Sequence, residues 1–225
     1  MRLLLISSSN VHGYGYLDHA EPDIKALLVG LKRVAFVPFA LANRDAYTEK
    51  VGARLELMGF ETIQVRGPKD LEPADAVFVG GGNTFRLLKA LYETGLVEAI
   101  RAAVRGGMPY IGSSAGTNVA ALSIKTTNDM PIVYPPSFDA LQLVSWQINP
   151  HYLDPEPDST HKGETREQRI QEFLEDNDTP VVGLREGTML RVENGVATLI
   201  GMRPARLFRR GAEPEELPVG SKIPF

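Results

Sequence analysis

The sequence predicts an α/β fold with a mostly parallel central sheet flanked by helices and with a C-terminal β-hairpin. Short apolar runs alternate with helix-like stretches through roughly the first half of the chain. Runs of this kind are typical of fully buried parallel strands, and the alternation indicates βαβ units in a sheet covered on both faces. In the last third, Asn194-Gly195 lies between two alternating runs. This is a strong hairpin signal, because type I′ turns need positive φ at both central residues.

The expected elements follow in chain order. The buried strands are predicted at Arg2–Ser7, Val34–Phe39, Thr62–Val65, Ala76–Val79 and Pro109–Gly112. Helices are predicted where apolar residues recur on one face, at Asp45–Met58, Phe85–Tyr92, Leu96–Val104, Thr117–Leu122 and Thr165–Leu174. The hairpin strands are Thr188–Val192 and Val196–Ile200, and Ala205–Arg209 is a candidate for a further antiparallel strand. Since no shift in composition marks a boundary, we expect a single α/β domain over residues 1–225.

Composition excludes several functional classes. The chain has 225 residues, no cysteine, and 24 Lys and Arg against 28 Asp and Glu, for a net charge of −4. Without cysteine there is no disulfide framework, thiolate metal site or cysteine nucleophile. The acidic balance argues against a nucleic-acid partner. No apolar run reaches the about 7–15 residues of a signal peptide or the about 20 of a membrane helix, so we expect a cytoplasmic protein without a membrane partner.

One strand-to-helix turn has the pattern of a serine nucleophile. Gly112-Ser113-Ser114-Ala115-Gly116 matches G-x-S-x-G, between a predicted strand and a predicted helix. Glycine on both sides relieves crowding at such a turn, and backbone N–H groups face the oxyanion that forms there. Ser114 is therefore the candidate nucleophile. The alternative is a Gly/Ser-rich turn with a structural role only.

A second loop, Val79–Thr84, carries three successive glycines after another predicted strand. It lacks the Walker lysine, and its spacing does not fit the dinucleotide motif G-x-G-x-x-G. The loop could provide an oxyanion hole, with the N–H of Gly82 facing Ser114. A tight β-to-α turn without a catalytic role is the alternative.

A histidine base must come from the only four histidines of the chain. His12 and His19 follow the first strand, His151 follows an apolar stretch, and His161 lies in a polar loop. The chemistry of the sequence does not choose between His151 and His161.

An acid that orients the base is also required, and two carboxylates lie at loop positions near predicted strand ends. These are Asp129 and Glu186. Either could instead act as a helix cap or a turn residue.

Taken together, these motifs resemble the peptidase E family of α-aspartyl dipeptidases, serine peptidases with a glutamine-amidotransferase-like, flavodoxin-like fold. The resemblance runs nearly end to end and is densest at Val79–Thr84, Tyr110–Asn118, Thr126–Val133, Phe138–Leu141, Gln147–His151 and His161–Ile170. It implies Ser114 as nucleophile, His151 as general base, either Asp129 or Glu186 as acid, and the N–H groups of Gly82 and Ala115 as oxyanion donors. Two local departures are Ser113, where the family often has Trp, and Arg185 before Glu186.

The resemblance also implies a small peptide substrate with an N-terminal aspartate, whose α-amine and β-carboxylate need opposite charges in the site. Arg166 is the candidate for the carboxylate, because its planar fork matches a carboxylate bidentately. Glu164 is the candidate for the amine, Asn83 for orienting the substrate, and His161 for a neighbour on the substrate side. The alternative for this charged segment is a solvated helix start.

No cofactor or metal is expected, since no histidine pair has the H-E-x-x-H spacing. The protein is expected to be a monomer or homodimer.

One rival function is a cyanophycinase-like or isoaspartyl-directed serine peptidase on the same fold. Another is a catalytically silent relative that only binds a small molecule. An α/β-hydrolase is a third, but its triad runs in the order Ser, acid, His.

Overall fold

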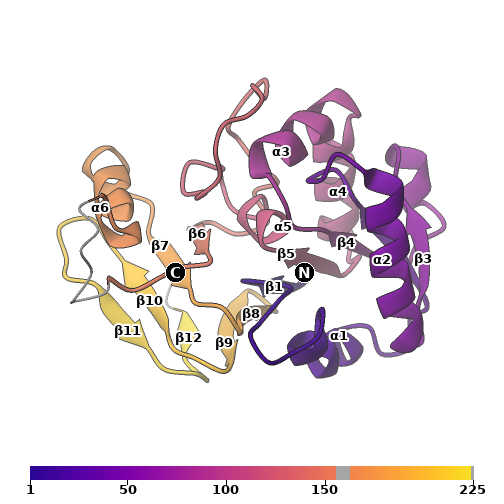
Figure 1. The fold of residues 1–225 in the computed structure, drawn as a ribbon, viewed down its shortest axis with the longest axis horizontal. Coiled ribbons are helices and arrows are strands. Elements are labelled where there is room, and N and C mark those ends of the chain that lie inside the picture. Colours follow the sequence, from indigo (N-terminus) through magenta and orange to yellow (C-terminus); the bar gives the residue numbers. More distant parts are fainter. Residues whose placement is uncertain (156–162, 224–225) are drawn as a thin grey trace.

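The structure, a computed structural model, describes residues 1–155 and 163–223. Its centre is an eight-stranded sheet in the order β12-β9-β8-β1-β5-β4-β2-β3 (Figure 1). The strands are β1 (Arg2–Ile6), β2 (Arg33–Val37), β3 (Glu61–Gln64), β4 (Ala76–Val79), β5 (Tyr110–Ser113), β8 (Thr188–Glu193), β9 (Val196–Gly201) and β12 (Lys222–Ile223). The strands from β1 to β3 in this order pair in parallel, whereas β8, β9 and β12 join antiparallel. The predicted α/β fold with a mostly parallel sheet is therefore confirmed.

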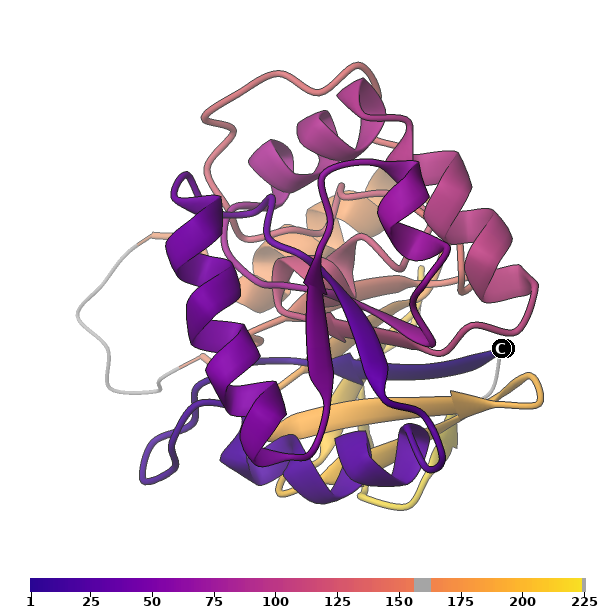
Figure 2. The same ribbon diagram turned by 90° about the vertical axis from the view of Figure 1, so that its right-hand side faces the viewer.

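Helices cover both faces of this sheet (Figure 2). They are α1 (Glu21–Leu27), α2 (Arg44–Leu57), α3 (Thr84–Glu93), α4 (Leu96–Arg105) and the short α5 (Ala115–Asn118). Successive side chains of a strand point to opposite faces. In β1, Leu4 packs in the buried cluster that includes α1 and α2, while Leu3 and Leu5 pack in the cluster that includes α3 and α4. The near-continuous apolar runs of the sequence reflect this burial on both sides.

Side-chain caps fix where three helices begin. The Asn43 side chain accepts from the N–H of Ala46 at the start of α2, and Asn83 accepts from Arg86 at the start of α3. Thr165 and Gln168 form a reciprocal capping box at the start of α6 (Arg166–Asp176). Two short 3₁₀ turns, Asp18–Ala20 and Pro68–Leu71, complete the helical elements of the described residues. No helix in the described residues is long and apolar enough to cross a membrane.

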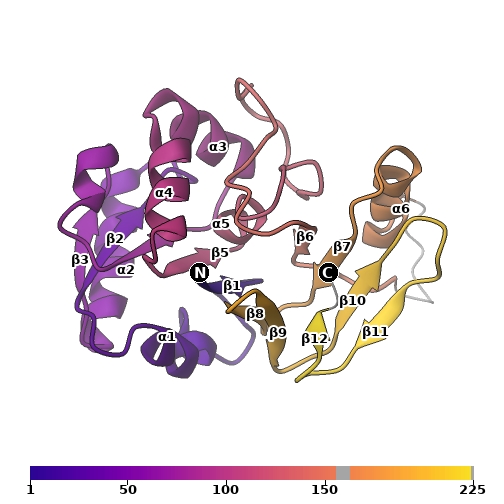
Figure 3. The ribbon, with the colours of Figure 1, turned by 180° about the vertical axis from the view of Figure 1, so that it is seen from behind.

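The structure contains a second sheet that the sequence analysis did not predict. Its four strands, in the order β11-β10-β7-β6, are β6 (Gln147–Pro150), β7 (Val181–Leu184), β10 (Ala205–Phe208) and β11 (Glu215–Leu217). This sheet and α6 lie at the end of the molecule away from β3 (Figure 3). The expected strand at Ala205–Arg209 thus belongs to the second sheet and pairs antiparallel with β7 and β11.

Two other local expectations can be compared with the structure. β8 and β9 pair antiparallel with Glu193 opposite Val196, and both Asn194 and Gly195 have positive φ. The helix expected at Thr117–Leu122 is wrong in its bounds, since α5 covers only Ala115–Asn118. Beyond it, the carbonyl of Val119 accepts from the N–H of Leu141 rather than from a further helical turn.

Candidate active site

Ser114 occupies a strained turn between β5 and α5. Its backbone has φ 53° and ψ −109°, a conformation that L-residues adopt only when their surroundings impose it. A Cβ added to Gly112 would lie 2.5 Å from the carbonyl oxygen of Gly116, and one added to Gly116 would lie 2.0 Å from that of Val79. Both glycines of the G-x-S-x-G motif are therefore required by close backbone packing.

Hydrogen bonds hold this turn in place. The N–H of Ser114 donates to the carbonyl of Ile6 at 3.0 Å, which ties the turn to the end of β1. The Thr117 hydroxyl lies 2.6 Å from the same carbonyl oxygen and 2.8 Å from that of Gly112. The buried Tyr110 hydroxyl donates to the carbonyl of Gly116 at 2.6 Å. The seryl oxygen thus has a fixed position above the carboxyl ends of β1 and β5.

His151 follows β6 directly and reaches Ser114. Its Nε2 lies 2.9 Å from Ser114 Oγ. The backbone of His151 also has positive φ, at 53°, and its N–H donates to Ser7 Oγ at 3.0 Å. The Ser7 hydroxyl in turn donates to the carbonyl of Leu184 at the end of β7, at 2.8 Å. Ser7 thereby links the backbone that carries the histidine to the first strand and to β7.

Glu186 contacts the other ring nitrogen of His151, with 2.9 Å between Oε1 and Nδ1. An ionised carboxylate only accepts hydrogen bonds, so the neutral imidazole donates from Nδ1 and leaves Nε2 free to accept the seryl proton. The side chains of His151 and Glu186 are 37% and 44% exposed, so substrate can approach them. The three side chains in contact follow the chain order Ser, His, Glu, which differs from the order Ser, acid, His of an α/β-hydrolase.

Asp129, the other candidate acid, lies elsewhere. Its Oδ2 accepts from the N–H of Thr84 at 2.7 Å and from the Thr84 hydroxyl at 2.6 Å. The carboxylate therefore sits at the N-terminus of α3, where negative charge is favoured by the helix dipole. Of the two candidate acids, Glu186 contacts a ring nitrogen of His151 and Asp129 does not. The role of Glu186 as the acid that orients the histidine stays a prediction.

The glycine loop Val79–Thr84 lies against Ser114. A Cβ added to Gly81 would be 3.0 Å from Ser114 Cβ, and one added to Gly82, whose φ is 134°, would be 2.7 Å from the Ala40 carbonyl oxygen. Gly82 therefore has to be glycine for reasons of both conformation and space. Ala115 is the first residue of α5, so its N–H has no partner within the helix. The role of these two N–H groups as oxyanion donors stays a prediction.

Comparisons with known proteins identify the family. The model of peptidase family S51 matches residues 3–200. The chain belongs to this family. It is 61% identical to Peptidase E of Streptomyces coelicolor, with 99% of this chain and 93% of that protein covered. It is 53% identical to the probable alpha-aspartyl dipeptidase of Drosophila melanogaster, with 96% of this chain and 92% of that protein covered.

Two solved structures share the fold of this S51 peptidase. A putative peptidase E from Listeria monocytogenes has a TM-score of 0.67 at 22% identity, with 89% of this chain and 98% of that chain covered. A peptidase from an acI-B1 actinobacterium has a TM-score of 0.70 at 19% identity, with 100% and 96% covered. The resemblance inferred from the sequence motifs is thereby confirmed at the level of family and fold.

The residues predicted to bind substrate have different environments in this S51 peptidase. Asn83 uses both ends of its amide within the protein, accepting from Arg86 and donating to the carbonyl of Met130. Glu164 is exposed and accepts from Arg169 at 3.3 Å. Arg166 is partly buried at the start of α6 and interacts electrostatically with Asp129. His161 lies outside the described residues.

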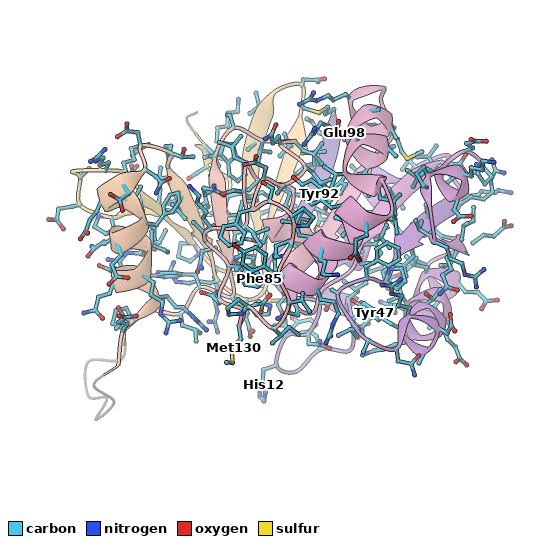
Figure 4. The ribbon with its side chains drawn as sticks, turned by 90° about the horizontal axis from the view of Figure 1, so that it is seen from above. His12, Tyr47, Phe85, Tyr92, Glu98 and Met130 are labelled. Carbon is cyan, nitrogen blue, oxygen red and sulfur yellow. The ribbon has the colours of Figure 1, made fainter. Side chains whose placement is uncertain are left out.

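The other two histidines that the structure describes, His12 and His19, have no hydrogen bond to the Ser114 cluster, which consists of Ser114, His151 and Glu186. His12 projects from the periphery of the molecule, as does the exposed Met130 (Figure 4). His19 packs edge-on against Tyr14, with 6.4 Å between ring centroids. Within the described residues, no group of three or more potential metal ligands comes together.

Sequence reasoning missed two residues that shape the site. Ser7 positions the His151 backbone, and Asn128 donates from its amide to the carbonyl of Pro150 at 2.7 Å. Ser7 lies where β1 ends, at the carboxyl edge of the parallel sheet. This position was the one feature of the sequence that could have indicated its role. Asn128 had no such signal, because its partner lies in the unpredicted second sheet.

Proposed function

We propose that this S51 peptidase hydrolyses dipeptides with an N-terminal aspartate through an acyl-enzyme on Ser114. The observation that carries the proposal is the continuous contact from Ser114 Oγ through the His151 ring to Glu186, with 2.9 Å at each step. The relatives named Peptidase E and alpha-aspartyl dipeptidase support the substrate class.

The reaction proceeds in two halves. His151 Nε2 accepts the Ser114 proton as Oγ attacks the peptide carbonyl carbon, and the imidazolium is stabilised by Glu186. The N–H groups of Gly82 and Ala115 donate to the oxyanion. His151 then gives its proton to the departing amine, which leaves an aspartyl ester on Ser114. His151 then accepts a proton from a water molecule whose oxygen attacks the ester carbonyl, and it gives that proton to the departing Ser114 Oγ as aspartate is released.

Charges around the start of α6 suit a substrate with one ammonium and one carboxylate group. Burial, together with the neighbouring Arg169, lowers the pKa of Arg166, while Asp129 opposes this shift. The Arg166 guanidinium nevertheless stays charged, because arginine does not lose its proton in proteins. We propose that the fork of Arg166 binds the β-carboxylate of the substrate, because within the described residues Arg166 makes no hydrogen bond to a carboxylate. Glu164 remains the proposed partner of the amine, and Asp129 adds negative charge beside Arg166.

A panel of dipeptides tests the function. We expect purified protein to hydrolyse Asp-Leu and to leave Leu-Asp, Asn-Leu and isoAsp-Leu nearly intact, as measured by liquid chromatography of the released amino acids. Cleavage of isoAsp-Leu in preference to Asp-Leu would instead support the cyanophycinase-like alternative. Binding of Asp-Leu without hydrolysis would support the catalytically silent alternative.

Replacing Arg166 by methionine tests its predicted role. We expect kcat/KM for Asp-Leu to fall about 10–100-fold, since hydrogen bonds to charged groups contribute about 1.5–3 kcal/mol. The ratio of kcat/KM between Asp-Leu and Asn-Leu should collapse in parallel. Arg169→Met, one turn further along α6, is the matched control and should keep that ratio. Unchanged selectivity in Arg166→Met would contradict the assignment.

We propose that residues 1–225 act as a single peptidase domain, as a monomer or homodimer, and that the absence of cysteine reflects a reducing cytoplasmic environment.

A further inference from the structure

Arg185, next to the proposed acid, is an unusually well-satisfied arginine. All five of its N–H groups donate to oxygens at 2.6–2.9 Å. Two go to the carboxylate of Asp154, two to that of Glu216, and one to the carbonyl of Pro204. The Arg185 side chain is only 10% exposed. The contacts with Arg185 lower the pKa of Asp154, so this pair is charged on both sides at neutral pH.

These contacts join the two segments that carry the base and the acid. β6 and β7 pair in parallel with Pro150 beside Leu184, so His151 and Arg185 leave the sheet at the same edge. Asp154 lies three residues after His151, and Arg185 immediately precedes Glu186. The Arg185–Asp154 pair therefore fastens the segment after the base to the segment before the acid.

Both segments need such an anchor. Glu186 sits in a four-residue turn closed by a hydrogen bond from Thr188 N–H to the Arg185 carbonyl, with Gly187 at φ 79°. His151 has a backbone conformation that persists only when its surroundings over-determine it.

We propose that Arg185, acting through Asp154, is a positioning residue that sets the separation between Glu186 and His151. The guanidinium of Arg185 fixes the orientation of the Asp154 carboxylate as well as its distance, because two parallel hydrogen bonds to one carboxylate restrict rotation. The second carboxylate, Glu216, ties the same guanidinium to β11, which carries no member of the Ser114 cluster. The proposal rests on the Ser114–His151–Glu186 arrangement of the proposed function and not on the identity of the substrate.

Asp154 and Glu216 form a matched pair for the test. Each accepts two hydrogen bonds from Arg185, and each side chain is 48% exposed. Each also lies near Arg206, at 3.7 and 3.8 Å. Asp154→Asn and Glu216→Gln therefore remove equivalent charges, but only the first loosens the segment that carries His151.

The experiment measures the activation of Ser114 in the full-length chain. A small uncharged fluorophosphonate reports the rate of attack by Ser114, followed by intact mass, and Asp-Leu hydrolysis gives kcat and KM. We expect Asp154→Asn to lower both the phosphonylation rate and kcat by about 10-fold or more, since a misplacement of reacting groups by about 1 Å can lower a rate 10²-fold. KM should change little, and Glu216→Gln should stay near the wild-type rate. Thermal melts should show similar, small losses in both variants.

A double variant separates positioning from general destabilisation. If the Arg185–Asp154 pair acts by setting the separation between Glu186 and His151, adding Asp154→Asn to Glu186→Gln should give no further loss, because the effects of residues that act as one unit are not additive. Equal slowing by Asp154→Asn and Glu216→Gln, an unchanged rate in Asp154→Asn, or full additivity with Glu186→Gln would each overturn the proposal.

The same measurements distinguish a failure of the proposed function. Wild-type protein that is phosphonylated at Ser114 but leaves Asp-Leu intact would refute the substrate assignment, while the phosphonylation rates still decide the role of Arg185. Wild-type protein that is not phosphonylated at Ser114 would overturn both.

Discussion

Replacing Ser114 by alanine is expected to lower kcat for Asp-Leu by about 10⁶-fold, the order of loss seen when a serine nucleophile is removed. His151→Ala should lose a similar amount. The double variant should be no slower than either single variant, because Ser114 Oγ and His151 Nε2, which are 2.9 Å apart, perform one proton transfer together. The activity that remains would come from substrate binding and oxyanion stabilisation.

Ser113 provides the matched control for this prediction. It precedes Ser114, is fully buried, and its hydroxyl has no hydrogen-bond partner among the described residues. Ser113→Ala therefore removes one oxygen atom at the same turn without breaking a hydrogen bond. We expect it to retain kcat within a few-fold and to retain its melting temperature. Substantial turnover by Ser114→Ala, or a comparable collapse in Ser113→Ala, would contradict Ser114 as the nucleophile.

The sequence was sufficient to find Ser114 because the reason for its geometry is local. Gly112 and Gly116 are required by backbone atoms within a few residues or in the adjacent β4, and that requirement leaves a pattern in five consecutive letters. The parallel strands were predictable for a similar reason, since burial on both faces demands continuous apolar runs.

The sequence could not show which of Asp129 and Glu186 lies against His151, because this depends on contacts between distant segments. Glu186 reaches His151 through the pairing of β6 with β7 in the second sheet. β6 contains Gln147, Asn149 and Pro150. Because two of these residues have polar amide side chains, the strand does not stand out as an apolar run, although it is buried. The NH₂ group of Asn149 donates to the Thr126 carbonyl, so this polar side chain is accommodated inside the protein, and a hydropathy pattern does not reveal the strand.

Removing the charge of Glu186 is expected to affect catalysis far more than removing the charge of Asp129. Glu186→Gln should lower kcat by about 10⁴-fold, the size of loss found when an amide replaces a triad acid and stabilises the wrong histidine tautomer. The glutamine can present its NH₂ group to His151 Nδ1, and the ring proton then moves to Nε2, where it blocks acceptance of the Ser114 proton. KM should change little, since the lost interaction acts on the transition state.

Asp129→Asn is the matched control, because it removes the charge of the other candidate acid without changing the size of the side chain. Its carboxylate binds only Thr84 among the hydrogen bonds of the described residues, so its loss should weaken the start of α3 by about 1 kcal/mol. Steady-state kinetics on Asp-Leu and thermal melts of both variants separate the two roles. A loss of kcat in Asp129→Asn equal to that in Glu186→Gln would mean that the charge near Arg166 matters as much as the orientation of His151. The contact of 2.9 Å between Glu186 and His151 argues for the larger effect at Glu186, because only there does the carboxylate determine which ring nitrogen is free to act as a base.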